Sequence, residues 1–356
     1  DESLSETHKS DTSRQQRYRM PTLYAALDDR VLVVRGQRRS HCAQGTQWDC
    51  TERLREHDME CLAASPEHPE RVFVGTVDSG LERSTDGGET WHAAGEFTDR
   101  VTAVTVSPHD PDTIWVGTEP SAVYRSTDGG VSFEKRDGLT DLLSANQWSF
   151  PPRPHTHHAR WLAVHPTDPD RIYVSIEAGA FVRSDDGGES WKPHPEGARR
   201  DNHTLATHPD VPSHVYTAAS DGYAESADCG ESWTYPQDGL DHRYVWGLAV
   251  DPGDPETVII SVAPGARTAH APARAESYVY RKTGSSDSWE LAMDGLGDPA
   301  GTVRAVLAAG DGAGEFAALT NRGISRSHDA ARTWHRLTIP WPEEYEQTVG
   351  RGLAVV

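Results

Sequence analysis

The sequence predicts an all-β protein, a seven-bladed β-propeller, and three observations support this fold class. A turn motif of the form Ser-x-Asp-x-Gly-x-Ser/Thr-Trp/Phe recurs along the 356 residues. Copies follow pairs of short apolar segments, which gives a repeating unit of about 40 residues. The composition, with 31 glycines and 23 prolines, suits many short strands joined by tight turns rather than long helices.

The turn motif has a mechanical explanation at each position. Its aspartate can accept backbone N–H groups of the turn, its glycine can take a positive φ, and its closing aromatic residue anchors the hairpin in the core. Clear copies begin at Arg83, Arg125, Arg183 and Glu225, and decayed copies begin at Arg281 and Ser325. We therefore interpret the motif aspartates as structural rather than catalytic, namely Asp86, Asp128, Asp186 and Asp228.

The segments before each turn motif supply the other strands of the unit. "AVTVSPHDPDTIWVGT" and "LAVHPTDPDRIYVSI" each contain an apolar strand, a Pro/Asp turn and a second apolar strand. Together with the two strands that flank the turn motif, they give four strands per unit. Four strands in about 40 residues are typical of a propeller blade.

The two ends of the chain complete one blade. Residues 22–27, 30–36 and 47–54 read as the second, third and fourth strands of a blade without a first strand. The closing segment "VGRGLAVV" matches the first strands of other units, such as "VWGLAVDP". We predict that this C-terminal strand completes the first blade and closes a ring of seven. Residues 21–356 would form this propeller, after a flexible polar tail at 1–20.

Charge and composition exclude several functions. The net charge of −21 comes from 55 acidic and 34 basic residues, and such a field repels nucleic acid and anionic membranes. An acidic surface with few lysines resembles proteins of salt-loving archaea. Four cysteines without a CxxC pair do not form a disulfide framework, and no apolar run approaches the ~20 residues of a membrane span. With no visible signal peptide, we expect a cytoplasmic protein.

Two insertions interrupt the repeat. The closing aromatic residues are usually 42 residues apart, as from 91 to 133, but 58 residues separate 133 from 191 and 56 separate 233 from 289. The excess lies in "NQWSFPPRPHTHHARW", residues 146–161, and in "APGARTAHAPARAES", residues 263–277. Because strands alternate in direction, both insertions are expected on the same rim of the propeller, where function usually resides.

One position of the inner strands also points to that rim. Six residues before the proline that ends these strands, polar or aromatic side chains replace the apolar ones of a blade core. We predict an arginine-rich, positively charged mouth that binds a carboxylate, sulfate or phosphate, although pairs such as Arg160 with Glu177 could instead only tie blades together. The aligned residues are Glu60, Thr102, Arg160, His203, Trp246, Arg304 and Arg351.

Other candidate residues lie next to this ring in the sequence. Glu60, Glu177, His158, His203 and Tyr244 are candidate catalytic groups, because carboxylates and imidazoles exchange protons near neutral pH. The candidate ligand-binding residues are Arg100, Arg153, Arg160, Trp246, Arg304 and Arg351.

The histidines of the first insertion suggest a metal as an alternative. Imidazoles are common ligands of Zn²⁺, Mn²⁺ and Cu²⁺, and three of them are close together in the chain. A divalent metal ion is the cofactor that this alternative requires. Its ligands would be His155, His157 and His158.

The turn motif and the blade pattern resemble the BNR, or Asp-box, propellers. That group includes sialidases and related glycosidases, xyloglucan-cleaving enzymes, the sortilin ectodomain and the photosystem II stability/assembly factor. The likeness to sialidases implies an arginine triad, which Arg160, Arg304 and Arg351 would imitate, and a Tyr nucleophile paired with Glu, with Tyr244 beside Glu60 or Glu177. The absence of a Phe-Arg-Ile-Pro motif and the count of seven blades argue against a true sialidase.

Three functions therefore stay open. The first is a glycosidase-like enzyme, or a related hydrolase or lyase, that binds a small anionic or sugar ligand at the mouth of the channel. The second is a non-catalytic propeller that docks a protein partner, as the assembly factor does. The third is a metal site on the loop at residues 155–158.

Overall fold

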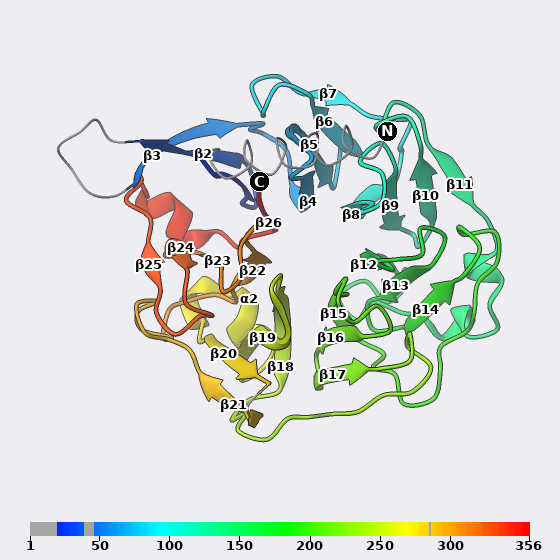
Figure 1. The fold of residues 1–356 in the computed structure, drawn as a ribbon. Coiled ribbons are helices and arrows are strands. Elements are labelled where there is room, and N and C mark those ends of the chain that lie inside the picture. Colours follow the sequence, from blue (N-terminus) through cyan, green and yellow to red (C-terminus); the bar gives the residue numbers. More distant parts are fainter. Residues whose placement is uncertain (1–19, 39–45, 285) are drawn as a thin grey trace, which may run out of the picture.

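The computed structural model describes residues 20–38, 46–284 and 286–356. Within these residues the strands form seven antiparallel sheets, which Figure 1 shows as a ring around a central axis. The predicted all-β, seven-bladed propeller is therefore confirmed. The predicted tail lies outside the described residues except for its last member, Met20.

The strands of each blade follow one another outward from the axis. Blade 1 holds β26 (Gly352–Val355), β1 (Thr22–Ala26), β2 (Val31–Arg38) and β3 (Thr46–Arg53), and blade 2 holds β4 (Met59–Ser65), β5 (His68–Thr76), β6 (Leu81–Ser84) and β7 (His92–Ala93). Blade 3 holds β8 (Arg100–Val106), β9 (Ile114–Glu119), β10 (Val123–Ser126) and β11 (Glu134–Arg136), and blade 4 holds β12 (Ala159–Val164), β13 (Ile172–Ile176) and β14 (Ala180–Ser184).

The remaining blades continue the ring. Blade 5 holds β15 (Asn202–Ala206), β16 (Val215–Ala219) and β17 (Gly222–Ser226), and blade 6 holds β18 (Tyr244–Asp251), β19 (Asp254–Ala263), β20 (Tyr278–Thr283) and β21 (Ser286–Leu291). Blade 7 holds β22 (Val306–Ala309), β23 (Phe316–Thr320), β24 (Gly323–Ser327) and β25 (His335–Arg336). The short helices are η1 (Leu139–Asp141), η2 (Ala145–Gln147), α2 (Ala266–His270), η3 (Pro272–Arg274) and η4 (Glu343–Gln347).

Blades 4 and 5 depart from the prediction of four strands per unit. Their outermost strand shrinks to one isolated bridge, from Arg183 to Lys192 in blade 4 and from Glu225 to Thr234 in blade 5. Prolines follow closely, at residues 193, 195 and 236. A proline has no N–H to donate to a ladder, so the fourth strand cannot extend there.

The C-terminal strand closes the ring as the sequence predicts. Strand β26 pairs antiparallel with β1, in the register Leu23 with Val355 and Tyr24 with Ala354. Beyond the strand, Thr22 and Val356 exchange two backbone hydrogen bonds of 2.7 and 2.9 Å. The first blade is therefore built from both ends of the described chain, and each holds the other in place.

The turn motifs bind neighbouring blades together. In the copy of blade 4, Asp186 Oδ1 accepts the Ser190 N–H at 2.9 Å and the Ser184 hydroxyl at 2.8 Å. In blade 3, Gly130 has a φ of 83°, and a Cβ placed on it would lie 2.5 Å from the Phe73 ring of blade 2. Glycine is needed there both for the turn and for the close approach of two blades. The motif aspartates thus form structural hydrogen bonds, as predicted.

No helix among the described residues is long and apolar enough to cross a membrane.

We predict that Ala354→Pro will strongly destabilise the ring. Thr22 and Val356 form a hydrogen-bonded pair, so the alternation of an antiparallel ladder gives the same two bonds to Tyr24 and Ala354. Proline removes the Ala354 N–H, and we expect the free energy of unfolding to fall by at least about 2 kcal/mol. Denaturant unfolding measures this loss. Ala354→Ser keeps the N–H and is the control, and an unchanged stability in the proline variant would contradict the latch.

Candidate functional site

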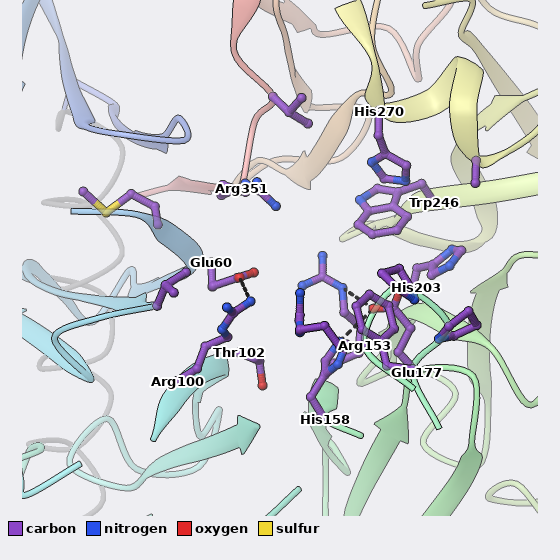
Figure 2. Close-up of a pocket in the computed structure, with 18 of the residues that line it drawn as sticks. Glu60, Arg100, Thr102, Arg153, His158, Glu177, His203, Trp246, His270 and Arg351 are labelled. Carbon is purple, nitrogen blue, oxygen red and sulfur yellow. Dashed lines mark hydrogen bonds and ion pairs between the residues drawn. The ribbon is translucent and has the colours of Figure 1, made fainter. Parts of the chain in front are cut away.

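A cavity of about 760 Å³ opens at the end of the propeller axis where the sequence predicts a ligand-binding mouth. Six of the seven predicted inner-strand positions line it, and the seventh, Arg304, is 1% exposed and lies just behind it. Both insertions contribute, through Arg153 and His158 from the first and His270 from the second. Figure 2 shows these side chains converging on one space. The lining positions from the inner strands are Glu60, Thr102, Arg160, His203, Trp246 and Arg351.

The mouth is balanced in charge rather than positive, which corrects the sequence-based expectation. Three of its arginines are held by carboxylates. Arg100 NH1 lies 3.0 Å from Glu60 Oε1, Arg351 Nε donates to Asp28 Oδ1 at 2.6 Å, and Arg153 donates two bonds to the buried Glu119, of 2.7 and 2.6 Å. Sequence reasoning missed these pairs because the partners lie on different blades or, for Asp28 and Arg351, at the two ends of the chain that build blade 1, so no repeat spacing relates them.

Two further arginines have no hydrogen-bonded carboxylate among the described residues, although Arg160 forms a longer ion pair with Glu177. Arg160 is 7% exposed, and its nearest carboxylate oxygen among the described residues is Glu177 Oε2, 3.5 Å from Nε. Arg304 donates to neutral acceptors, the Gly350 carbonyl at 2.9 Å and His270 Nδ1 at 3.1 Å. Burial and the charges of Arg160 and Arg351 hold the pKa of Arg304 well below its ordinary value. Positive charge is thus concentrated on one wall.

Trp246 is the centre of this wall. The guanidinium carbons of Arg160 and Arg304 lie 4.7 and 4.1 Å from the centre of its ring, as in cation–π contacts. The imidazole rings of His203 and His270 lie 4.3 and 4.4 Å from it. The indole ring therefore contacts both buried guanidinium groups and restricts their orientation. The three arginines of the predicted triad, Arg160, Arg304 and Arg351, do lie near one another.

The hydrogen bonds around His270 fix its tautomer. An arginine can only donate, so His270 Nδ1 accepts from Arg304, and its Nε2–H donates to the Tyr244 oxygen 2.9 Å away. Tyr244 is then left with its own O–H to donate elsewhere, and it lines the cavity. Burial and the charge of Glu177 raise the pKa of Tyr244, so its hydroxyl keeps its proton at neutral pH.

Blades 4 and 5 contribute a group of hydrogen-bond acceptors to the cavity, in contrast to the arginines around Trp246. Glu177 accepts a 2.9 Å hydrogen bond from His158 Nε2. Burial raises the pKa of Glu177, but the hydrogen bond from His158 and the charges of His158 and Arg160 outweigh burial and lower the pKa to about 2. Asp201 and His203 lie beside it, and one ligand atom from each of the three falls within 4.8 Å of the others.

The ring of His203 is also held in one orientation. Its Nδ1 lies 2.7 Å from the Val245 carbonyl oxygen, which can only accept, so Nδ1 carries the hydrogen. The other nitrogen, Nε2, lies 3.9 Å from Asp201 Oδ1. Burial lowers the pKa of His203, which favours the neutral ring with a lone pair on Nε2.

The structure does not bring the three histidines of the first insertion together. His155 is exposed, His157 packs edge-on against Trp148 with ring centres 5.5 Å apart, and His158 packs against Phe150 and bonds to Glu177. They do not form a group of metal-ligand atoms within 4.8 Å of one another. The metal-ligand geometry among the described residues involves His203 instead.

Three members of the site were missed by sequence reasoning. His270 lies in the second insertion, which the sequence places at this rim without singling out the residue. Asp28 occupies the loop between the second and third strands of blade 1, where Glu177 occurs in blade 4, and Asp201 lies two residues before His203. The loop position was the available signal for Asp28.

The turn motif, the seven sheets and the cavity define the class of this protein, a seven-bladed β-propeller with BNR/Asp-box repeats. The family model of the BNR/Asp-box repeat matches residues 82–93. No curated protein matches the chain.

Solved structures that share this fold include GH74 enzymes and a peptide-bound YCF48. The chain aligns with an ancestral GH74 enzyme (TM-score 0.58, 19% identity, 75% of this chain and 36% of that one) and with the GH74 xyloglucanase of Xanthomonas campestris (0.57, 17%, 78% and 47%). It aligns equally with YCF48 bound to D1 peptide (0.57, 16%, 84% and 92%). The chain thus spans less than half of these GH74 proteins, and at such identities the likeness shows the fold alone.

We predict that His270 will make the protein sensitive to acid. In the unfolded chain a histidine binds a proton below about pH 6.5. In the folded protein burial and the charge of Arg304 lower the pKa of His270 to about 2, with a smaller opposing effect of Glu177. The unfolded state therefore binds more protons below pH 6.5, and stability falls as the pH falls, by up to about 1.4 kcal/mol per pH unit for this group.

Denaturant unfolding at pH 7, 6 and 5 measures this slope. His270→Gln is expected to remove about that amount from the slope between pH 6.5 and 5. His155→Gln, at an exposed position, is the matched control and should leave the slope unchanged. Equal slopes in the wild type and in His270→Gln would contradict a neutral, buried His270.

Proposed function

We propose that the protein binds a small organic anion in the cavity and acts on it as a hydrolase or lyase. The observation that carries this proposal is the pair of buried guanidinium groups, Arg160 and Arg304, which face no hydrogen-bonded carboxylate among the described residues. Arg304 has no ion-paired carboxylate among the described residues and Arg160 has only the 3.5 Å ion pair with Glu177, so a carboxylate or phosphate of a ligand would supply further negative charge. Planar guanidinium groups bind such oxyanions in a bidentate manner.

The rest of the cavity suits a ligand with hydroxyl groups, such as an acidic sugar. Its volume of about 760 Å³ lies in the range of small-molecule sites. Tyr244 offers a hydroxyl donor beside the arginine wall, while Glu177, Asp201 and His203 offer acceptors. Proton donors and acceptors that face one space are what general acid and base catalysis requires. Tyr244 would be the acid, because its oxygen accepts from His270 and its own O–H can be donated into the cavity.

Glu60, by contrast, has a supporting role in this proposal. Its carboxylate is bound to Arg100, and Figure 2 shows this pair on the side away from Trp246 and His203. Arg153, which the first insertion carries, is held by Glu119 and would cover the ligand at the mouth. His158 would position Glu177 through its hydrogen bond rather than contact the ligand as an acid.

A second candidate function is peptide binding without catalysis. The chain spans 92% of the structure of YCF48 bound to D1 peptide, and less than half of the GH74 proteins. A peptide C-terminus would place a carboxylate against the same arginines. The two functions differ in whether the bound molecule is converted.

We predict that Arg160→Met will weaken anion binding. A thermal-shift screen with uronic acids, dicarboxylates and sugar phosphates, in dilute and in concentrated KCl, should find compounds that raise the melting temperature of the wild type. Loss of one charge-assisted contact of about 1.5–3 kcal/mol weakens binding by at least about tenfold. Arg281→Met removes an arginine paired with Glu290 on an outer strand and is the control. Unchanged binding in Arg160→Met would contradict the proposal.

Tyr244→Phe separates catalysis from binding. Loss of the acid is expected to lower kcat about 100-fold or more, while the dissociation constant stays within a few fold. Product formation followed by NMR measures kcat of the wild type and of Tyr244→Phe. Tyr235→Phe, at an exposed tyrosine outside the cavity lining, should retain full activity. A wild type that binds the compound tightly and never converts it would favour the binding function instead.

A further inference from the structure

Glu177, Asp201 and His203 converge from two neighbouring blades. Glu177 follows β13 of blade 4, and Asp201 and His203 lie at the start of β15 in blade 5. One ligand atom of each, a carboxylate oxygen or the imidazole nitrogen, lies within 4.8 Å of the other two. All three residues line the cavity, and Figure 2 shows Glu177 and His203 on the same side of it. Small side-chain movements would bring the three atoms to one ion.

Each of the three is already oriented by a second contact. The Val245 carbonyl holds His203 through Nδ1 at 2.7 Å, and the Ala178 N–H donates to Asp201 Oδ1 at 2.7 Å. His158 Nε2 donates to Glu177 Oε2 at 2.9 Å. A backbone carbonyl on the far nitrogen of an imidazole and a hydrogen bond to a ligating carboxylate are the usual supports of metal ligands.

The remaining atoms face one another without a hydrogen bond. His203 is 1% exposed, and with the hydrogen on Nδ1 its Nε2 is an acceptor that lies 3.9 Å from Asp201 Oδ1, itself an acceptor. No hydrogen bond to His203 Nε2 is present among the described residues. His203 Nε2 and Asp201 Oδ1 are thus two acceptors placed against each other at the cavity wall, with the Asp201 side chain 31% exposed, and a cation between them would satisfy both.

We propose that Glu177, Asp201 and His203 bind one divalent transition-metal ion, Zn²⁺ or Mn²⁺, with open coordination positions toward the cavity. A donor set of one imidazole and two carboxylates suits these ions, whereas Ca²⁺ prefers oxygen ligands throughout. Three protein ligands with a vacant position are typical of catalytic metal sites. The presence of the metal does not depend on the proposed function.

The role of the metal does rest on the proposed function. Arg160 Nε lies 3.5 Å from Glu177 Oε2, so the ion and this guanidinium would share one wall. An oxyanion could then bind the arginine with one oxygen and the metal with another. The metal would supply the nucleophilic or basic water that the acceptor side otherwise lacks.

Metal titration of the whole chain tests the site directly. After removal of any affinity tag and of bound ions with EDTA, calorimetric titrations with Zn²⁺, Mn²⁺ and Ca²⁺ should give one Zn²⁺ or Mn²⁺ per chain and weaker binding of Ca²⁺. Asp201→Asn and His203→Gln should each weaken binding at least about tenfold. Asp58→Asn, a carboxylate of the same cavity, and His155→Ala, on the histidine loop, are matched controls and should bind as the wild type does.

Several results would overturn the proposal. They are no stoichiometric Zn²⁺ or Mn²⁺ in the wild type, unchanged affinity in Asp201→Asn, or loss of binding in His155→Ala, which would place the ion on the loop. Because His203 is buried, each variant is checked by circular dichroism, and the partly exposed Asp201 gives a second variant if His203→Gln fails to fold. The visible absorption of bound Co²⁺ in the wild type then reports the coordination number and geometry of the ion independently.

The thermal-shift screen and the metal titration of the wild-type protein distinguish the two proposals. Anion binding in the thermal-shift screen with no metal bound would remove only the metal site. Stoichiometric metal binding with no anion that stabilises the protein would remove only the proposed function.

Discussion

The pairing of β26 with β1 is the constraint on which both the ring and the cavity depend. The strand that closes the propeller carries Arg351 at its start, whose backbone N–H donates to the Ala26 carbonyl at 2.8 Å. Asp28, in the loop after β1, accepts from the Arg351 guanidinium at 2.6 Å and from the Val349 N–H at 2.9 Å. The wall between blades 7 and 1 therefore forms only when the ring closes, so that folding and site assembly are one event.

Within the closed ring, the distribution of charge decides what the cavity can hold. Most arginines of the mouth are neutralised by carboxylates from neighbouring blades, as Arg153 is by Glu119. The two arginines without a hydrogen-bonded carboxylate, Arg160 and Arg304, both contact the ring of Trp246. In a region of low dielectric constant such an unmatched charge acts strongly on a ligand, because little water screens it. The site is thus selective through one wall rather than through a general positive field.

The sequence predicted the scaffold well because its signals are local and periodic. The turn motif, the strand pairs and the match between "GLAVV" and other inner strands determine blades and closure, and one aligned position, six residues before the proline that ends the inner strands, identifies lining residues such as His203. Pairing between blades has no such period. The sequence therefore missed His270 and Asp201, and it overestimated the positive charge, since Asp28 and Glu119 neutralise arginines that are far away in the chain. Prolines near residues 193 and 236 explain the two shortened blades.

The turn motifs and the site use separate residues, and this separation explains why the fold alone does not indicate a function. None of the motif aspartates lines the cavity, and their hydrogen bonds stay within their own turns. Glycines of these turns, such as Gly130 against Phe73, instead fix the spacing of adjacent blades. The cavity is made by inner-strand ends and by the two insertions, which can change without disturbing those contacts. Propellers that share the turn motif can therefore carry different chemistry, and here the chemistry follows from the acceptors of blades 4 and 5 facing the cations around Trp246.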